Sequence, residues 1–223
     1  MTRVSPAKAW DEMLRGNERF TSGQPAHPRQ DIERLSELQD TQTPSVALFG
    51  CSDSRLAAEI IFDKGLGDLF VVRNAGQIIS DSVIGSLEYA VGVLGVSLIL
   101  VLGHDNCGAV SGAIALLDPE NPGFPPHVTE LVNKITPAVR RVAGAQKLFG
   151  ADGSVDFRAL DTMEVEREHL RDTISELLET SELISESIAA GNLAVVGANY
   201  RLGEGRVTPD VVVGIIDETP PTS

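Results

Sequence analysis

Hydrophobic and polar positions alternate along this chain in blocks that predict strands and helices in turn. Short runs rich in valine, isoleucine and leucine predict strands. Because these runs are apolar at successive positions, we expect the strands to be buried on both faces, as in a mainly parallel sheet covered by helices. The expected strands cover residues 45–50, 68–73, 97–103, 193–198 and 207–215.

Apolar residues at helical spacing predict helices between these strands. The expected helices cover residues 56–62, 81–94 and 108–117, with two or three more between 128 and 190 after a polar, proline-rich loop at 118–126. This alternation indicates one α/β domain over residues 41–217.

Two helices are expected ahead of the first strand. Ser5-Pro6 is typical of a helix start, and Trp10, Met13, Leu14 and Phe20 then recur at helical spacing. A second helix is expected over residues 31–38. We interpret residues 1–40 as an N-terminal helical arm that packs on the body or on another subunit, and expect the tail 218–223 to be disordered.

Composition narrows the function classes. The chain has 223 residues, 42% of them hydrophobic, and a formal net charge of −14. Such an acidic surface argues against nucleic acid and anionic membrane surfaces as partners. The apolar stretch 87–103 contains Glu88, Gly92 and Gly95, so a helix followed by a buried strand explains it better than a membrane span. With no export signal visible, we expect a cytoplasmic protein whose cysteines stay reduced.

Candidate chemistry is concentrated in two motifs that each follow a predicted strand. The first is Cys51-Ser52-Asp53-Ser54-Arg55, and the second is His104-Asp105-Asn106-Cys107-Gly108. They contain the only two cysteines of the chain. Two thiolates and one imidazole suit Zn²⁺, and without a third cysteine the fourth position stays open to water or substrate. The pattern therefore favours a catalytic zinc site.

Position within the predicted fold strengthens this interpretation. Ligand sites of open α/β sheets form at the carboxyl ends of strands, so Cys51, His104 and Cys107 converge if their two strands are neighbours. Cys107 and Gly108 begin a helix, whose positive end lowers the pKa of a thiol there. Taken singly, buried cysteines in a cytosolic protein are most often inert small hydrophobes, but these two share Gly-flanked turns after strands.

Asp53 and Arg55 form a second candidate pair. At this spacing in a turn, the guanidinium can hold the carboxylate ionised and aimed. A surface ion pair of little consequence is the simpler reading. The proximity of Asp53 to Cys51 favours a functional role for the pair. Asp53 would either accept a hydrogen bond from the zinc-bound water or become the fourth ligand of a closed, inactive state.

With these residues in place, the chain resembles the beta-class carbonic anhydrases of bacteria. The resemblance covers nearly the whole chain and is carried by the two motifs together with residues 70–76, residues 87–91 and the arm around Trp10 to Phe20. It implies a mainly parallel sheet of about five strands with an antiparallel edge strand, and a homodimer or homotetramer built through the N-terminal arm. It also implies reversible hydration of carbon dioxide to bicarbonate and a proton by a zinc-bound hydroxide, with one zinc per chain.

The resemblance also implies roles for individual residues. Cys51, His104 and Cys107 would be the zinc ligands, and Asp53 and Arg55 the catalytic dyad. The implied substrate site consists of Gln42, Phe70, Ala75, Tyr89 and Gly108, with Tyr89 supplied by the partner subunit.

The chain departs from some relatives at one regulatory site. Their non-catalytic bicarbonate site uses a tryptophan, an arginine and a tyrosine. Arg73 and Tyr200 match the last two, but Leu48 stands in the tryptophan position.

Three alternative functions stay open from the sequence: a zinc-stabilised interaction module without turnover, a thiol redox switch between the two cysteines, and hydrolysis of CS₂ or a similar molecule. The histidines outside the motifs, His27, His127 and His169, give no indication of a proton shuttle.

Overall fold

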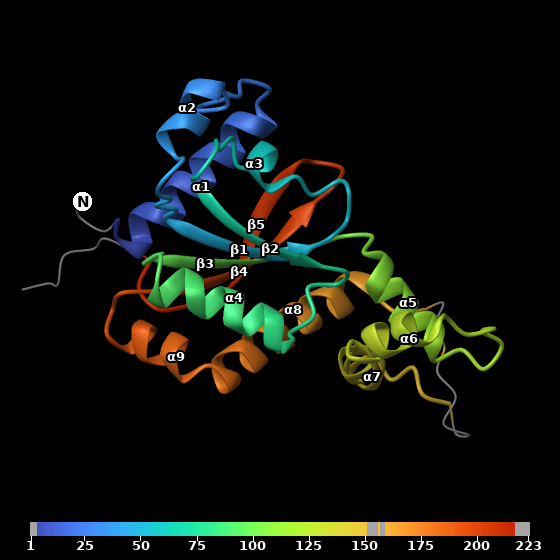
Figure 1. The fold of residues 1–223 in the computed structure, drawn as a ribbon. Coiled ribbons are helices and arrows are strands. Elements are labelled where there is room, and N and C mark those ends of the chain that lie inside the picture. Colours follow the sequence, from blue (N-terminus) through green and yellow to red (C-terminus); the bar gives the residue numbers. More distant parts are fainter. Residues whose placement is uncertain (1–3, 151–155, 157–158, 217–223) are drawn as a thin grey trace, which may run out of the picture.

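The computed structural model describes residues 4–150, 156 and 159–216. Its strands form one five-stranded sheet in the order β2-β1-β3-β4-β5 (Figure 1). The strands β2, β1, β3 and β4 are parallel, and β5 runs antiparallel to β4, as expected for the edge strand. The strands are β1 (Val46–Cys51), β2 (Leu69–Asn74), β3 (Leu98–His104), β4 (Ala194–Arg201) and β5 (Arg206–Val213).

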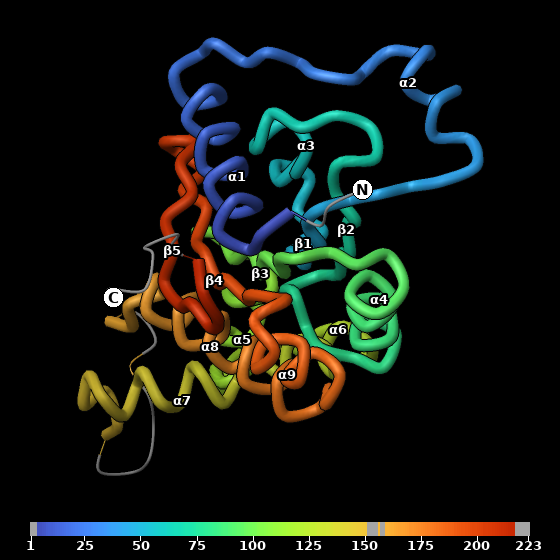
Figure 2. The backbone as a smooth tube through the Cα atoms, turned by 90° about the vertical axis from the view of Figure 1, so that its left-hand side faces the viewer, coloured from blue at the N-terminus to red at the C-terminus, as the bar shows by residue number. Residues whose placement is uncertain are grey.

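Helices cover both faces of this sheet (Figures 1 and 2). α1 and α3 lie on one face, α4, α8 and α9 lie on the other, and α5 to α7 gather at one end. The helices are α1 (Pro6–Thr21), α2 (Ile32–Glu37), α3 (Ala58–Ile61), α4 (Asp81–Gly92), α5 (Gly108–Leu116), α6 (Pro126–Asn133), α7 (Thr136–Ala145), α8 (Thr162–Thr180) and α9 (Glu182–Ala189).

The helical segment after the proline-rich loop differs from the expectation. Among the described residues, four helices lie between residues 126 and 190, where two or three were predicted. Prolines begin α6 and α7 within their first turns, and Ser181 both ends α8 and accepts the Ile184 N–H that caps α9. These breaks divide one amphipathic stretch more finely than apolar periodicity indicates.

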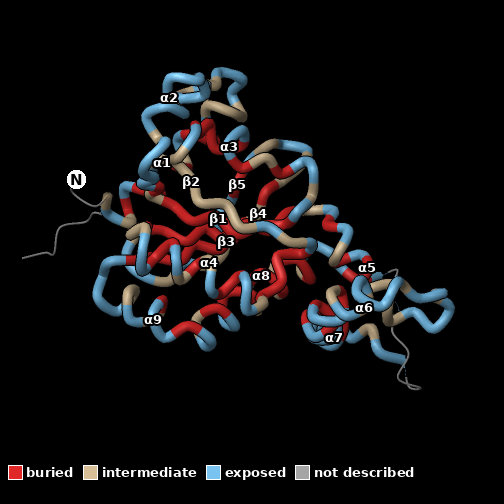
Figure 3. Tube along the Cα trace, viewed as in Figure 1, coloured by how far each residue is buried: buried red, intermediate tan, exposed pale blue. Residues whose placement is uncertain are grey.

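Burial follows the layers, with the central strands buried and the outer helix faces exposed (Figure 3). Every residue of β1 and β3 is buried, which confirms the expectation from their continuous apolar runs. Successive side chains point to opposite faces, so Leu48 joins the core under α1 and Phe49 joins the core under α4. The edge strands β2 and β5 are only partly buried.

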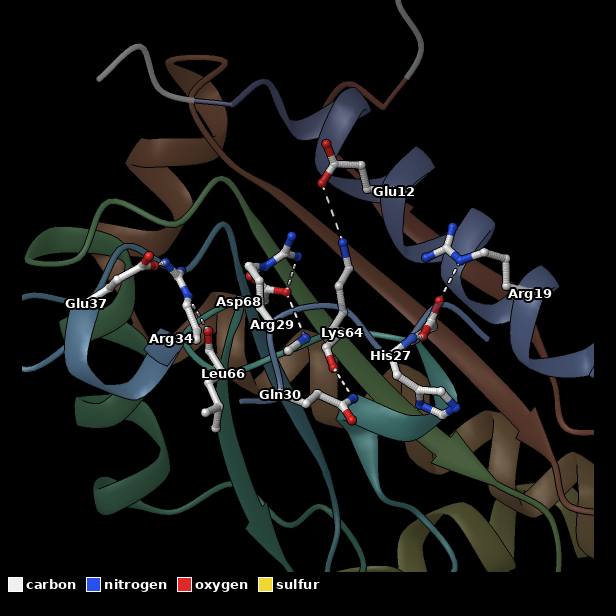
Figure 4. A network of polar contacts seen from close by, with 12 residues as sticks. Glu12, Arg19, His27, Arg29, Gln30, Arg34, Glu37, Lys64, Leu66 and Asp68 are labelled. Carbon is white, nitrogen blue, oxygen red and sulfur yellow. Dashed lines mark hydrogen bonds and ion pairs between the residues drawn. The ribbon is translucent and has the colours of Figure 1, made fainter. Parts of the chain in front are cut away.

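The N-terminal arm packs on the body of its own chain. Asn17 of α1 is buried and donates to the carbonyl groups of Ile61 and Gly205 at 3.2 and 2.8 Å, while its Oδ1 accepts the Val207 N–H at 2.9 Å. A polar network continues along the arm, in which Arg19 pairs with Asp63 (Figure 4). The predicted tail 218–223 lies outside the described residues.

Candidate metal centre

The two motifs meet because their strands are neighbours. β1 and β3 pair in parallel, with Gly50 opposite Leu102, so their carboxyl ends share one edge of the sheet. Cys51 ends β1, His104 ends β3, and Cys107 precedes the first residue of α5. β1 lies between β2 and β3, which is where the chain changes direction across the sheet and where α/β proteins place their ligand sites.

The three predicted ligands form one buried cluster. The Sγ atoms of Cys51 and Cys107 and a ring nitrogen of His104 lie within 4.8 Å of one another. His104 Nδ1 lies 2.8 Å from the Asp105 carbonyl oxygen, which can only accept, so Nδ1 carries the proton. Nε2 is therefore a bare acceptor, and it is buried without a hydrogen-bond partner among the described residues. This donor set fits zinc.

The environment of the thiols suits ligation. The Gly76 N–H donates to Cys51 Sγ at 3.3 Å. The hydrogen bond from the Cys107 thiol lowers the pKa of Cys51, and the Gly76 N–H adds to this effect, although burial opposes both. The same hydrogen bond and burial both raise the pKa of Cys107. The N–H groups at the start of α5 lower it, as expected for a helix N-terminus, but do not outweigh these effects. Because a thiol binds a metal ion as the thiolate, metal binding at this pair would release protons.

Asp53 and Arg55 form the predicted ion pair in a bidentate geometry. Arg55 donates from Nε to Asp53 Oδ1 at 2.8 Å and from Nη2 to Oδ2 at 2.7 Å, and its backbone N–H donates to Oδ1 at 2.9 Å. The guanidinium hydrogen bonds hold the pKa of Asp53 far below its usual range, although partial burial opposes them. Both carboxylate oxygens face Arg55, and Asp53 is not part of the ligand cluster among the described residues.

Arg73 supports the same turn from β2. Its Nε donates to the Cys51 carbonyl at 2.9 Å and its Nη2 to the Asp53 carbonyl at 2.6 Å. Arg73 therefore fixes the backbone that carries one ligand and one dyad residue.

A mostly apolar cavity of about 560 Å³ opens beside the cluster. Cys51 and Asp53 lie in its wall, together with two of the residues that the sequence suggested for the substrate site, Ala75 and Gly108. Ser52 of the first motif also lines it. The sequence interpretation did not include the rest of the lining, which comes from α5, α6 and the loop before α6: Ala109, Gly112, Phe124, His127, Val128, Leu131 and Val132. These residues carry no local motif, so only the packing of the helices places them at the site.

Three predicted substrate residues do not line this cavity. Phe70 and Tyr89 contact each other, with ring centroids 6.1 Å apart, and the Tyr89 side chain is 45% exposed. Gln42 is exposed in the segment before β1. One copy of the chain therefore does not bring Gln42, Phe70 and Tyr89 to the metal cluster.

Two buried residues of α8 bond backbone groups near the cluster, and nothing in the sequence indicates either of them. Glu166 Oε1 accepts the Cys107 N–H at 3.4 Å, and burial raises the pKa of Glu166 to about 7. His169 Nε2 lies 2.6 Å from the Gly76 carbonyl oxygen.

Known proteins share this arrangement of fold and motifs. A family model described as carbonic anhydrase matches residues 46–207. The chain is 44% identical over 219 residues to carbonic anhydrase 2 of Mycobacterium tuberculosis, an alignment that covers 98% of this chain and 99% of that protein. It is 45% identical over 222 residues to the carbonic anhydrase of Mycolicibacterium smegmatis, covering 98% and 100% of the two chains.

Solved structures agree with this placement. A tetrameric beta-carbonic anhydrase of Sordaria macrospora is similar with a TM-score of 0.66 and 26% identity, covering 90% of this chain and 95% of that one. The Coccomyxa beta-carbonic anhydrase in complex with acetazolamide gives the same TM-score and identity, covering 90% and 86%. The fold, the Cys-His-Cys cluster and these relatives together show that the chain belongs to the beta-carbonic anhydrase family, whose members are zinc enzymes.

Proposed function

We propose that the chain hydrates carbon dioxide reversibly to bicarbonate and a proton at the cluster of Cys51, His104 and Cys107, with Asp53 and Arg55 as its catalytic dyad. One observation carries the proposal: a bidentate Asp53–Arg55 pair lies beside the three ligand atoms in the wall of an apolar cavity. A purely structural zinc site does not need an ionised carboxylate in the wall of such a cavity.

The ligand residues supply the metal centre. Cys51 and Cys107 would bind Zn²⁺ through Sγ and His104 through its bare Nε2. When bound, zinc supplies a Lewis acid that makes a nucleophile from water near neutral pH. The Asp105 carbonyl holds the His104 ring in the tautomer that this ligation needs.

The dyad orients the reacting water. Asp53 is ionised, so its oxygens can accept a hydrogen bond from the attacking O–H group and point the oxygen lone pair at the substrate carbon. Arg55 prevents protonation of Asp53 and keeps its carboxylate aimed. Arg55 also donates to the Asn106 carbonyl at 3.2 Å, which ties the dyad to the second motif.

The apolar walls suit the substrate. Carbon dioxide carries no net charge or dipole, so Ala75, Gly108 and Phe124 can admit it without a desolvation cost, while charged bicarbonate favours solvent. This difference draws substrate in and releases product.

We further propose that a second copy completes the site. Gln42, Phe70 and Tyr89 lie away from the cavity of their own chain, so we assign them to the cavity of a partner in a homodimer or homotetramer. Residues 1–40 would serve as the arm at this contact, beside the α/β domain 41–217.

Among the described residues no helix is both long enough and apolar enough to cross a membrane. The two free cysteines suit a cytoplasmic enzyme with small-molecule substrates, and the acidic charge argues against a nucleic-acid partner.

Stopped-flow carbon dioxide hydration tests the proposal on the zinc-loaded wild type, Asp53→Asn and Cys107→Ser. We expect Asp53→Asn to keep one zinc per chain and lose about 10²-fold or more in kcat. Cys107→Ser should lose both zinc and rate. Asp11→Asn, in an exposed ion pair with Arg15, is the matched control and should behave as wild type.

The same variants separate the alternatives. A zinc-stabilised interaction module predicts that Asp53→Asn changes nothing. A redox switch predicts that Cys51 and Cys107 react with thiol reagents before any chelator is added, whereas zinc ligation protects both thiols.

A further inference from the structure

His169 is a buried histidine of α8 that the mechanism above does not use. It is 4% exposed, and its Nε2 lies 2.6 Å from the Gly76 carbonyl oxygen. Because a carbonyl oxygen only accepts, Nε2 carries the ring proton and donates it. Burial lowers the pKa of His169, which keeps the ring neutral and this tautomer populated.

The residue that His169 holds is in direct contact with a metal ligand. Gly76 donates its N–H to Cys51 Sγ at 3.3 Å. Hydrogen bonds of this kind orient a ligand sulfur and tune how strongly it donates to the metal. A chain of two hydrogen bonds therefore joins His169 of α8 to Cys51 through Gly76, which lies 93 residues before His169 in the sequence.

The turn between them needs an external anchor. Gly76 has a φ of +79° and Gln77 a φ of +41°, so two successive residues adopt the left-handed region. Glycine has the widest φ/ψ range of any residue, and its own sterics do not fix where its N–H points. Asn74 braces the turn internally through two hydrogen bonds to Ile78. The His169 bond fixes the carbonyl side of Gly76.

We propose that His169 is a positioning residue of the zinc site, which holds the Gly76 carbonyl so that the Gly76 N–H stays directed at the Cys51 sulfur. Thr173, one turn further along α8, donates its hydroxyl proton to the His169 carbonyl at 2.9 Å, and its Oγ1 lies 3.4 Å from the Gln77 carbonyl of the same turn. The inference rests on zinc binding at the proposed site.

Two substitutions separate the hydrogen bond from the packing. His169→Phe fills a similar volume but leaves the Gly76 carbonyl without its donor. His169→Gln is the rescue, because its amide can place an N–H near the position of Nε2. Leu177→Ala is the matched control. Leu177 is fully buried on α8 and belongs to the core under α4, whereas Cys51 and Cys107 belong to the core under α1.

Zinc release and a cobalt spectrum are the readouts. We expect His169→Phe to release zinc to a chromogenic chelator about 10-fold or more faster than wild type, as for other residues that support metal ligands. In the cobalt-substituted protein, the thiolate-to-metal charge-transfer band should shift. His169→Gln should return both readouts towards wild type, and Leu177→Ala should leave the band in place. Unchanged release and spectrum in His169→Phe, or an equal band shift in Leu177→Ala, would overturn the inference.

A measurement on the wild type covers the case in which His169→Phe does not fold. In the cadmium-113-loaded protein, the Gly76 amide proton should show scalar coupling to the metal through the hydrogen bond to Cys51. The absence of this coupling would contradict the inference. If the wild type binds zinc and His169→Phe behaves like it, only the role of His169 is refuted. If the wild type binds no metal, the proposed function is refuted as well.

Discussion

At the scale of single residues, one hydrogen-bond partner decides what each group of the centre can do. The Asp105 carbonyl accepts a hydrogen bond from His104 Nδ1–H, so the ring proton stays on Nδ1 and Nε2 is free for a metal. Arg55 donates to both oxygens of Asp53 and keeps that carboxylate ionised. A histidine with the opposite tautomer, or a protonated Asp53, would retain the shape of the site and lose its chemistry.

The protonation of Asp53 gives the residue-scale prediction. Arg55→Gln removes the guanidinium that stabilises the ionised carboxylate, so the pKa of Asp53 should rise towards the ordinary value of about 3.9. Carbon-13 NMR of the labelled side chain measures it: in wild type, Asp53 should stay ionised to the lowest pH at which the protein remains folded. The control Arg15→Gln, in an exposed pair with Asp11, should not move the Asp53 titration. Equal titration curves in wild type and Arg55→Gln would contradict the account.

At the scale of elements, two short turns after parallel strands bring the centre together. Cys51 ends β1 and Asp53 follows in the next turn, while His104 ends β3 and Cys107 lies at the end of the turn that follows. A third turn after β2, around Gly76, contacts the first through the Cys51 sulfur. The rigidity of these turns therefore determines the rigidity of the site.

The turn after β2 predicts a large difference between two glycine substitutions. In Gly76→Ala the new Cβ would lie 2.7 Å from Ala109 Cβ at a φ of +79°. We expect a loss of about 1–3 kcal/mol in the free energy of unfolding, measured by urea denaturation. Gly85→Ala is the control, because Gly85 is an interior position of α4 with open space around its Cβ. It should stabilise the protein by about 0.5–1 kcal/mol. Equal stabilities of the two variants would refute the strain at Gly76.

The N-terminal arm gives a second prediction for an element. The Asp63 carboxyl is buried and accepts Arg19 Nε and the backbone N–H groups of Ala26 and His27. Burial raises its pKa, but these hydrogen bonds outweigh burial and lower it overall. The stabilisation is thus present above the unfolded pKa of about 4 and is lost as pH falls through the lower folded value.

Asp63→Ala should accordingly cost about 3 kcal/mol near neutral pH, because it leaves buried N–H groups and Arg19 unpaired. The difference from wild type, measured by denaturation at several pH values, should shrink only in acid. The exposed Asp11→Asn variant should stay within about 0.5 kcal/mol of wild type. A pH-independent difference for Asp63→Ala would contradict this assignment.

At the scale of the whole molecule, the sequence predicted the metal cluster well and its surroundings less well. The ligands Cys51, His104 and Cys107 follow apolar strand runs, and because parallel strands share an edge for their carboxyl ends, their convergence could be predicted. Glu166 and His169 could not, since their contacts depend on how α8 docks under the sheet. The sequence predicted fewer helices than the four described between residues 126 and 190, because prolines and Ser181 begin and end helices there and apolar periodicity does not reveal these positions.

Complementation between inactive subunits tests the completion of the site by a second copy. Cys107→Ser lacks a metal ligand but keeps Gln42, and Gln42→Ala keeps the metal ligands. If Gln42 serves the partner's cavity, refolding the two together should restore roughly a quarter of the wild-type sites, because half of random dimers are mixed and each holds one complete site. Activity no greater than the sum of the separate variants would place Gln42 in its own chain's site.

X-ray absorption at the zinc edge tests the central claim most directly. The zinc-loaded protein should contain one zinc per chain, with two sulfur neighbours at about 2.3 Å and two nitrogen or oxygen neighbours at about 2.0–2.1 Å, one from His104 and one exchangeable. A shell without sulfur, or protein purified under reducing conditions that holds no stoichiometric zinc, would contradict the account.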